Sequence, residues 1–289
     1  ERLRKKKFEL RESFLGEARA LGKLRPTTNR ERSEAARVAQ VFDADVDENS
    51  GLFYIAQEFV DGVTLADVLK TRWNSLSRRK QELLMRNVVK SVRYAHDRGV
   101  PHGDISLSNF LVEDSLNARL VDFGMSSLGI PSSILYLAPE LIGGGNRSFE
   151  SDAWSLGVVL YRMTYGKFPF RLERASAGDH DAAKSSLDDV VKTAEEYAEL
   201  CSKVREDRPV GMSDDFFSKI FGNFIWGLLE KDPEKRCSVR KSLWYVRDER
   251  LLGGYAAGVV ASVSIASVIA WAFLRPLPEL SSLSLPPGK

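Results

Sequence analysis

Two short polar segments contain the side chains best suited to chemistry. In HGDISLSNFLV, Asp104 and Asn109 lie five residues apart, and in LVDFG, Asp122 follows an apolar run. Carboxylate and amide oxygens are hard ligands of the kind that Mg²⁺ prefers, and a carboxylate beside them can orient an incoming hydroxyl group. The three side chains therefore predict a magnesium-dependent phosphoryl-transfer site. Neither segment is specific alone, since a DFG tripeptide can also be a turn that buries its Phe.

The elements around these segments predict an α+β fold. Apolar residues have helical spacing over residues 8–24, and two strand-like segments, 37–46 and 51–60, flank a polar turn. A small sheet followed by mostly helix is typical of folds that segregate the sheet from the helices. Beyond residue 64 the pattern is mainly helical, and we expect helices within 65–76, 77–99, 151–166, 186–205 and 214–230.

Composition excludes several classes of protein. The 289 residues are 43% hydrophobic and 28% charged, which is typical of a folded chain rather than a disordered one. A net charge of +2 excludes a nucleic-acid-binding protein that relies on bulk positive charge, so we expect no nucleic-acid partner. The two cysteines, Cys201 and Cys237, are too few for a disulfide framework, and no Cys/His spacing indicates zinc.

Residues 251–274 contain no charged side chain and are long enough to span a bilayer, which takes about 20 apolar residues. Small residues are frequent in this segment, and Tyr255 and Trp271 lie near its ends. We therefore expect a single-pass transmembrane helix over 251–274 and a flexible tail over 275–289, with a buried core helix as the alternative. Basic residues before the segment favour a cytosolic globular part.

Six motifs follow one another in a fixed order: LFYIAQEFVDGVTLADVL, HGDISLSNFLV, LVDFG, YLAPE, SDAWSLGVVLYRMTYGKFPF and KDPEKRCS. In this succession the chain resembles the eukaryotic protein kinase superfamily, from near residue 14 to near residue 247. The resemblance implies a bilobal protein-kinase-like domain over 1–250, with an incomplete N-lobe sheet in 1–62 and a mainly helical C-lobe in 63–250. It also implies ATP and Mg²⁺ as cofactors and a protein as the substrate.

The resemblance assigns roles to the polar residues. Asp104 corresponds to the catalytic-loop base that orients the substrate hydroxyl, and Asn109 and Asp122 correspond to the magnesium ligands. Glu17 matches the helix Glu that pairs with the nucleotide-binding Lys, with an ordinary solvated helix charge as the alternative. Gln57 would be the gatekeeper residue at the back of the adenine pocket.

The resemblance also assigns the nucleotide hinge and an internal hydrophobic column. The hinge, whose backbone hydrogen-bonds adenine, would run from Glu58 to Val60. His102 and Phe123 would belong to the hydrophobic column, so we expect a structural rather than a catalytic role for His102. Ser133, three residues before Tyr136, lies where Ser/Thr-directed kinases carry a hydroxyl, which favours Ser/Thr substrates.

Further matches are architectural. Glu140 in the APE motif and Arg236 in DPEKR would form a buried ion pair. Asp152 would open the central helix and accept backbone N–H groups of the catalytic loop, and Ser151 is a candidate cap for that helix.

The chain departs from the kinase pattern in several places. No Gly-rich loop and no strand with the nucleotide-binding Lys occur in it, and the activation segment, 122–140, is short. Gly103 replaces the Arg that usually precedes the catalytic Asp, which disfavours a phosphorylation-dependent switch. Ser106 replaces the phosphate-contacting Lys, which predicts a lowered turnover. A long insert, 171–213, could bind a protein partner.

Three functional hypotheses remain open on the sequence alone. The first is a membrane-tethered Ser/Thr protein kinase, motivated by Asp104, Asn109 and Asp122. The second is a pseudokinase, a binding module with little phosphotransfer, motivated by the missing small-lobe strands, Gly103 and Ser106. The third is a structural fragment that cannot fold alone. A narrower resemblance to divergent apicomplexan rhoptry kinases and pseudokinases would imply a secretory organelle or vacuole rather than the cytosol.

Overall fold

The computed structural model describes most of the chain up to residue 242. The chain divides into two compact units, Glu1–Val246 and Arg247–Lys289, and every described residue belongs to the first. The described residues are 11–28 except 13 and 17, 34–47, 53–123, 134–170 except 143, 199, 202–204 and 216–242. Outside them lie Glu17, Ser133, the segments 251–274 and 275–289, and all but four residues of the insert 171–213.

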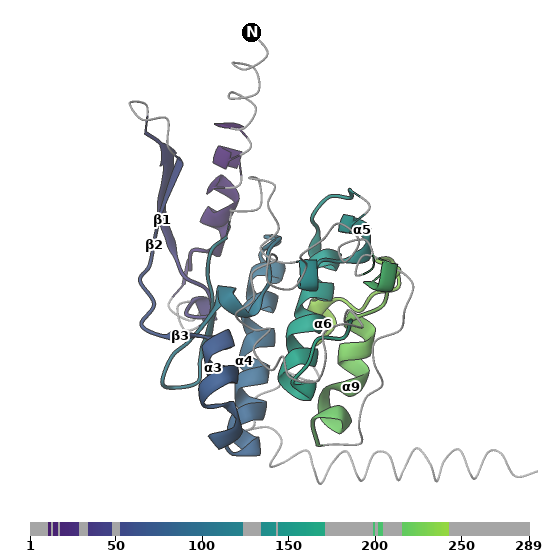
Figure 1. Cartoon of the computed structure of the whole chain (residues 1–289). Coiled ribbons are helices and arrows are strands. Elements are labelled where there is room, and N and C mark those ends of the chain that lie inside the picture. The colour runs from purple at the N-terminus through teal and green to yellow at the C-terminus, as the bar shows by residue number, and fades with distance from the viewer. Residues whose placement is uncertain are drawn as a thin grey trace, which may run out of the picture. The chain divides into compact units, whose positions relative to one another are not determined.

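Two antiparallel strands form the first sheet, β1 (Val41–Val46) and β2 (Phe53–Gln57). Both lie within the predicted strand segments, and the pairing register shifts between Val41 and Asp43. Helical residues between 11 and 21 lie beside this sheet, where the rings of Phe14 and Phe53 meet edge to face at 4.9 Å (Figure 1). The two strands and this helix are the elements predicted for the first part of the chain.

Two capped helices follow the short strand β3 (Val63–Thr64). Thr64 caps α3 (Leu65–Thr71) by accepting the N–H of Asp67 at 3.1 Å, and Ser77 caps α4 (Arg78–Asp97) in the same way. Because hydroxyl groups at these positions take up backbone donors that the first helical turn leaves unpaired, the sequence fixes where each helix begins. Both helices fall within the predicted ranges.

A second sheet carries the polar segments. It has the order β3–β4–β5, in which β4 (Phe110–Val112) pairs antiparallel with both β3 and β5 (Ala118–Leu120). An isolated parallel bridge joins Val38 to Leu120. The sheet therefore places the residues before β4 and those after β5 at one end of a hairpin.

The central helix is α6 (Phe149–Tyr165), in which every residue from Ser151 to Met163 is buried. Its N-cap is Ser148, whose hydroxyl accepts the N–H of Ser151, while the hydroxyl of Ser151 accepts the N–H of Ser148. The prediction that Ser151 caps the helix is therefore wrong, because the helix begins two residues earlier and Ser151 is the reciprocal partner in a capping box.

Two further helices belong to this part of the chain: α5 (Pro139–Ile142) and α9 (Phe216–Leu228). Helix α9 packs closely on α6. A Cβ added at Gly157 would lie only 2.9 Å from the Cβ of Leu228, so the two helices leave no room for a side chain there. The predicted helix at 214–230 is therefore confirmed. With two small sheets and a mainly helical remainder, the α+β prediction is confirmed as well.

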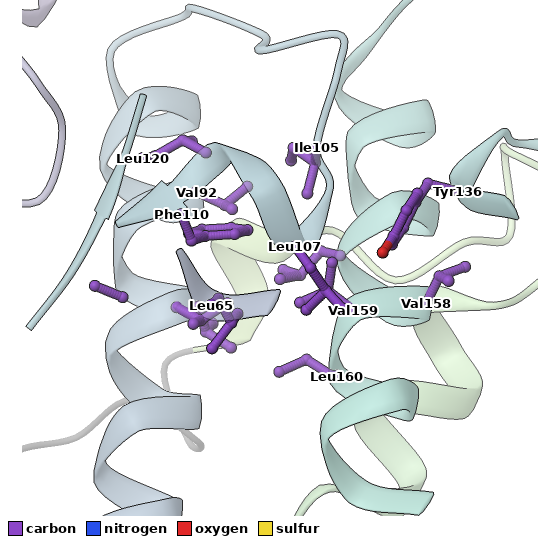
Figure 2. Close-up of a cluster of buried hydrophobic side chains, with 14 of the residues drawn as sticks. Leu65, Val92, Ile105, Leu107, Phe110, Leu120, Tyr136, Val158, Val159 and Leu160 are labelled. Atoms are coloured by element: carbon purple, nitrogen blue, oxygen red, sulfur yellow. The ribbon is translucent and has the colours of Figure 1, made fainter. Parts of the chain in front are cut away.

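One hydrophobic cluster holds these elements together. Figure 2 shows Leu65 of α3, Val92 of α4 and Val159 of α6 around Ile105 and Leu107, which come from the loop before β4. All five side chains are almost fully buried. The loop that carries Asp104 and Asn109 is therefore anchored in the core by its own apolar residues. Among the described helices, none is long and apolar enough to cross a membrane.

Candidate active site

Asp152, near the start of α6, holds the loop that carries the polar residues. Its carboxylate accepts the backbone N–H groups of His102 and Gly103, each at 2.7 Å, and contacts Nε2 of His96 at 2.9 Å. The predicted contact between Asp152 and the loop is therefore confirmed. Gly103 has a φ of 79°, in the left-handed region that favours glycine, which is a physical reason for glycine at this position.

The environment of Asp152 stabilises its charged form. The side chain is buried, and burial alone would raise the pKa of the carboxyl group. The hydrogen bond and charge of His96, together with the His102 N–H, outweigh burial, so that the pKa of Asp152 lies below its ordinary value. A buried carboxylate with this many donors stays ionised at neutral pH and anchors the loop.

His102 has a structural environment, as predicted. Its Nδ1 accepts the backbone N–H of Asp104 at 3.2 Å, so Nε2 carries the hydrogen that it donates to the carbonyl of Val121 at 2.8 Å. Its ring lies 4.5 Å from the ring of Phe123, and both side chains are buried. Burial lowers the pKa of His102 and keeps the imidazole neutral, so the ring links Asp104 to the end of β5.

Asp104, Asn109 and Asp122 lie at the same end of the β4–β5 hairpin. The amide Nδ2 of Asn109 donates to the carbonyl oxygen of Asp104 at 2.7 Å and to its Oδ2 at 3.2 Å. The backbone carbonyl of Asn109 accepts the N–H of Val121 at 2.9 Å, which brings Asp122 next to Asn109. Asp122 itself is exposed and has a φ of 61°, a sparsely populated conformation that recurs at functional sites.

The donor set fits a magnesium ion that keeps other oxygen ligands. Because the amide nitrogen of Asn109 faces Asp104, its Oδ1 is the atom left for a cation, beside the carboxylate of Asp122. Mg²⁺ commonly binds one or two protein ligands together with water and substrate phosphates. Among the described residues, no cluster of three or more His, Cys, Asp or Glu side chains could hold a metal ion on its own.

The hinge segment lies close to this end of the hairpin. Gln57, the last residue of β2, donates from Nε2 to Oδ1 of Asp122 at 3.1 Å. Glu58 donates its backbone N–H to the carbonyl of Gln40 at 2.7 Å. Val60 is buried, and within the described residues its N–H and C=O have no hydrogen-bond partner, so both are available to a ligand. The structure thus brings six predicted site residues together, whereas Glu17 lies outside the described residues.

Two features of the site were not predicted from the sequence. The first is the contact between Gln57 and Asp122, and the second is Arg119, a buried cation that pairs with Glu58 at 2.5 Å. No motif marks either pair, because each joins segments more than 60 residues apart in the chain. Ser106 is buried, and among the described residues its hydroxyl group has no hydrogen-bond partner.

A second predicted pair, outside the site, is present. The guanidinium of Arg236 makes two parallel contacts with the carboxylate of Glu140, at 2.6 and 2.9 Å. It also donates to the backbone carbonyls of Glu230, Lys231 and Glu150. The predicted ion pair is therefore confirmed, and it links the segment after the candidate activation loop to the residues beyond α9.

Comparison with known proteins agrees with this geometry. The family model for the protein kinase domain matches residues 25–245. The chain belongs to the protein kinase family. It is 31% identical over 205 residues to mitogen-activated protein kinase kinase 1 of Arabidopsis thaliana, a match that covers 68% of this chain and 53% of that protein.

Other kinases match over similar or shorter stretches. NUAK family SNF1-like kinase 1 of Homo sapiens is 36% identical over 135 residues, covering 44% of this chain and 20% of that protein. Serine/threonine-protein kinase PLK4 of Xenopus tropicalis is 27% identical over 208 residues, covering 68% of this chain and 19% of that protein. The kinase domain described here thus spans about half of the Arabidopsis relative and about a fifth of the other two.

Proposed function

We propose that this chain is a Ser/Thr protein kinase that transfers the γ-phosphoryl group of ATP to a protein hydroxyl group. The observation that carries the proposal is the gathering of Asp104, Asn109 and Asp122 at one end of the β4–β5 hairpin. Matches to kinases with Ser/Thr in their names support the substrate class. Phosphoryl transfer depends mainly on positioning and charge stabilisation, and these residues suit both.

Each residue has a role set by its contacts. Asp104 orients the substrate hydroxyl and accepts its proton, because its carboxylate lies on a loop that Asp152 and His102 hold in place. Asn109 and Asp122 bind Mg²⁺ through oxygen atoms. Bound Mg²⁺ supplies positive charge that neutralises the triphosphate.

The hinge recognises the adenine base in this proposal. The N–H and C=O groups of Val60, unpaired among the described residues, provide one donor and one acceptor, and Glu58 supplies a second backbone acceptor. Gln57 links the hinge to the proposed metal ligands, because its amide donates to the carboxylate of Asp122. Glu17 is expected to pair with a nucleotide-binding Lys, and no candidate for that Lys is found in the chain.

Phosphotransfer by the full-length chain to a Ser-containing basic peptide tests the proposal. We expect Asp104→Ala and Asp122→Asn each to lower the rate at least about a hundredfold, since each removes a group that acts on the reacting atoms. Asp114→Asn is the matched control, because Asp114 is an exposed carboxylate in the β4–β5 turn. Equal rates for wild type and Asp122→Asn would reject the kinase proposal.

A pseudokinase is the second candidate, and two observations favour it. Ser106 occupies the position of a phosphate-contacting Lys, and a buried hydroxyl group supplies no positive charge there. Oδ1 of Asp122 is also occupied by Gln57. Nucleotide binding without transfer above the Asp104→Ala background would support this second function, and measurable transfer would reject it.

We further propose that residues 251–274 anchor the kinase domain to a bilayer as a single-pass helix and that the insert 171–213 binds a protein partner. The uncharged length of 24 residues supports the anchor, and the basic residues before it favour a cytosolic kinase domain. Extraction of the expressed chain with alkaline carbonate tests the anchor. The wild type should stay with the membrane, and a chain ending at residue 250 should be released.

A further inference from the structure

Arg119 in β5 connects three segments of the kinase domain. It is 7% exposed, and its Nη2 contacts Oε2 of Glu58 at 2.5 Å while donating to the carbonyl of Val38 at 3.1 Å. Its Nη1 lies 3.5 Å from Oε1 of Glu113. A buried guanidinium with these partners fixes the hinge, the segment before β1 and the β4–β5 hairpin relative to one another.

Glu58 is held from two sides. Its Oε2 also accepts the backbone N–H of Gln40 at 3.2 Å, and its own backbone N–H donates to the carbonyl of Gln40 at 2.7 Å. Side chain and main chain of the first hinge residue are therefore both fixed. Val60, whose backbone groups have no hydrogen-bond partner in the described part of the chain, follows two residues later, so its position depends on how firmly Glu58 is held.

The same strand leads to the metal ligands. Leu120 donates to the carbonyl of Arg37 at 2.9 Å and accepts the N–H of Ala39 at 3.0 Å, and Val121 donates to Asn109. Asp122 is the next residue. Only two residues thus separate the cation that holds the hinge from the carboxylate proposed to bind magnesium.

We propose that Arg119 is a positioning residue for the nucleotide, which sets the spacing between the hinge that binds the base and the Asp122 carboxylate that binds the metal. The proposal rests on the proposed nucleotide-binding function. A ligand that reaches both ends benefits from this fixed spacing, because little ordering of the hinge remains to be done on binding. A ligand that reaches only the metal end does not depend on it.

This dependence separates positioning from simple stabilisation. Loss of a merely structural ion pair would weaken binding of every ligand alike. Loss of a positioning contact weakens ATP, which has a base, and leaves tripolyphosphate, which has none, almost unchanged. The affinity ratio between MgATP and magnesium tripolyphosphate is therefore the informative quantity.

Three variants of the full-length chain suit the test. Arg119→Met keeps the length and the apolar stem of the side chain and removes its charge. Glu58→Gln weakens the same ion pair from its more exposed end and leaves Arg119 paired with Glu113. It replaces Arg119→Met in the test if that variant does not fold. Arg86→Met is the matched control, because Arg86 contacts Glu82 at 2.6 Å within α4.

Hydrogen exchange of the free chain provides the first measurement. Peptides that cover residues 53–62 should exchange about fivefold faster in Arg119→Met than in the wild type, since the hinge loses its side-chain anchor. Arg86→Met should leave exchange in these peptides unchanged. Unaltered exchange of the hinge in both Arg119→Met and Glu58→Gln would overturn the inference without any nucleotide.

The second measurement is the affinity of each variant for MgATP and for magnesium tripolyphosphate, determined by calorimetry. We expect Arg119→Met to raise the Kd for MgATP about tenfold, which corresponds to about 1.4 kcal/mol, and to change the Kd for tripolyphosphate less than about twofold. Glu58→Gln should shift the same ratio about threefold. A folded Arg119→Met variant that keeps the wild-type ratio overturns the positioning role alone, whereas a wild-type chain that binds neither ligand overturns the proposed function as well.

Discussion

Asp152 accepts the backbone N–H of Gly103 at 2.7 Å, although the two residues are 49 positions apart in the chain. The same carboxylate takes the N–H of His102 and contacts His96. One side chain of the central helix thus satisfies the backbone of the loop that presents Asp104. The core therefore fixes the position of Asp104, because Asp152, which holds its loop, lies on the most buried helix of the described chain.

Removal of this anchor should destabilise the kinase domain strongly. Asp152→Ala leaves the buried N–H of His102, the partly buried N–H of Gly103 and Nε2 of His96 without their acceptor, and each unsatisfied buried donor costs about 1–3 kcal/mol. We expect a loss of about 3 kcal/mol or more in the free energy of unfolding, measured with urea on the full-length chain. Asp114→Ala, at an exposed carboxylate, should change it by less than about 0.5 kcal/mol. Similar losses for both variants would contradict the anchoring role.

Stability should fall on acidification because of His102 and Asp152. Burial lowers the pKa of His102 below 6.5, so the folded domain keeps the ring neutral while the unfolded chain takes up a proton below that pH. The contribution of neutral His102 to the free energy of unfolding is complete above pH 6.5. It decreases by at most about 1.4 kcal/mol per pH unit as the pH falls towards the lowered pKa. The pKa of Asp152 is also lowered, so its contribution is present above pH 3.8 and is lost as the pH falls further.

Urea unfolding at pH 7.5, 6.5 and 5.5 checks the direction in which stability changes with pH. The wild type should lose stability between pH 6.5 and 5.5, and His102→Phe should show a smaller loss over the same interval. The variant will be less stable at pH 7.5, because it gives up the bond to Val121, so the comparison concerns the slope. A steeper decline in His102→Phe than in the wild type would rule out this cause.

The order of the motifs predicted two sets of contacts around the site, and the hydrophobic pattern predicted the helices and strands. Asp152 with the loop amides and Glu140 with Arg236 both came from motifs whose positions in the fold are fixed together. The start of α6 was misplaced because Ser148 and Ser151 are chemically equivalent caps, and only the backbone conformation of Ser148 separates them. Periodicity therefore located this helix within two residues.

Side-chain pairs between distant segments could not be predicted in this way. Gln57 meets Asp122 and Arg119 meets Glu58 only because the hinge runs past the end of β5. Apolar spacing tells which face of a strand is buried, and it carries no information about which polar group lies opposite on another element. The available signal was an Arg inside the apolar run before Asp122, since a cation in a buried strand requires partners.

Two glycines should respond in opposite ways to replacement by alanine. A Cβ at Gly157 would lie 2.9 Å from the Cβ of Leu228 and 3.0 Å from Leu229, where α6 and α9 touch, so Gly157→Ala should cost about 1–3 kcal/mol. A Cβ at Gly16 meets nothing within 4 Å in a helical segment, so Gly16→Ala should stabilise by up to about 1 kcal/mol. Thermal unfolding of both variants measures the contrast, and a destabilised Gly16→Ala together with a neutral Gly157→Ala would refute it.

Gln57 should weaken magnesium binding, because its amide competes for the carboxylate of Asp122. The bond from Nε2 to Oδ1 is 3.1 Å long and exposed, so its net contribution is about 0.5–1 kcal/mol. Gln57→Leu removes the donor, and we expect the Mg²⁺ concentration for half-maximal binding of tripolyphosphate to fall about two- to fivefold. Tripolyphosphate is the suitable ligand because it lacks a base and so does not sense the altered adenine side of residue 57. Asn74→Leu, at another exposed amide, is the control, and an unchanged Mg²⁺ requirement in Gln57→Leu would show that the contact does not oppose metal binding.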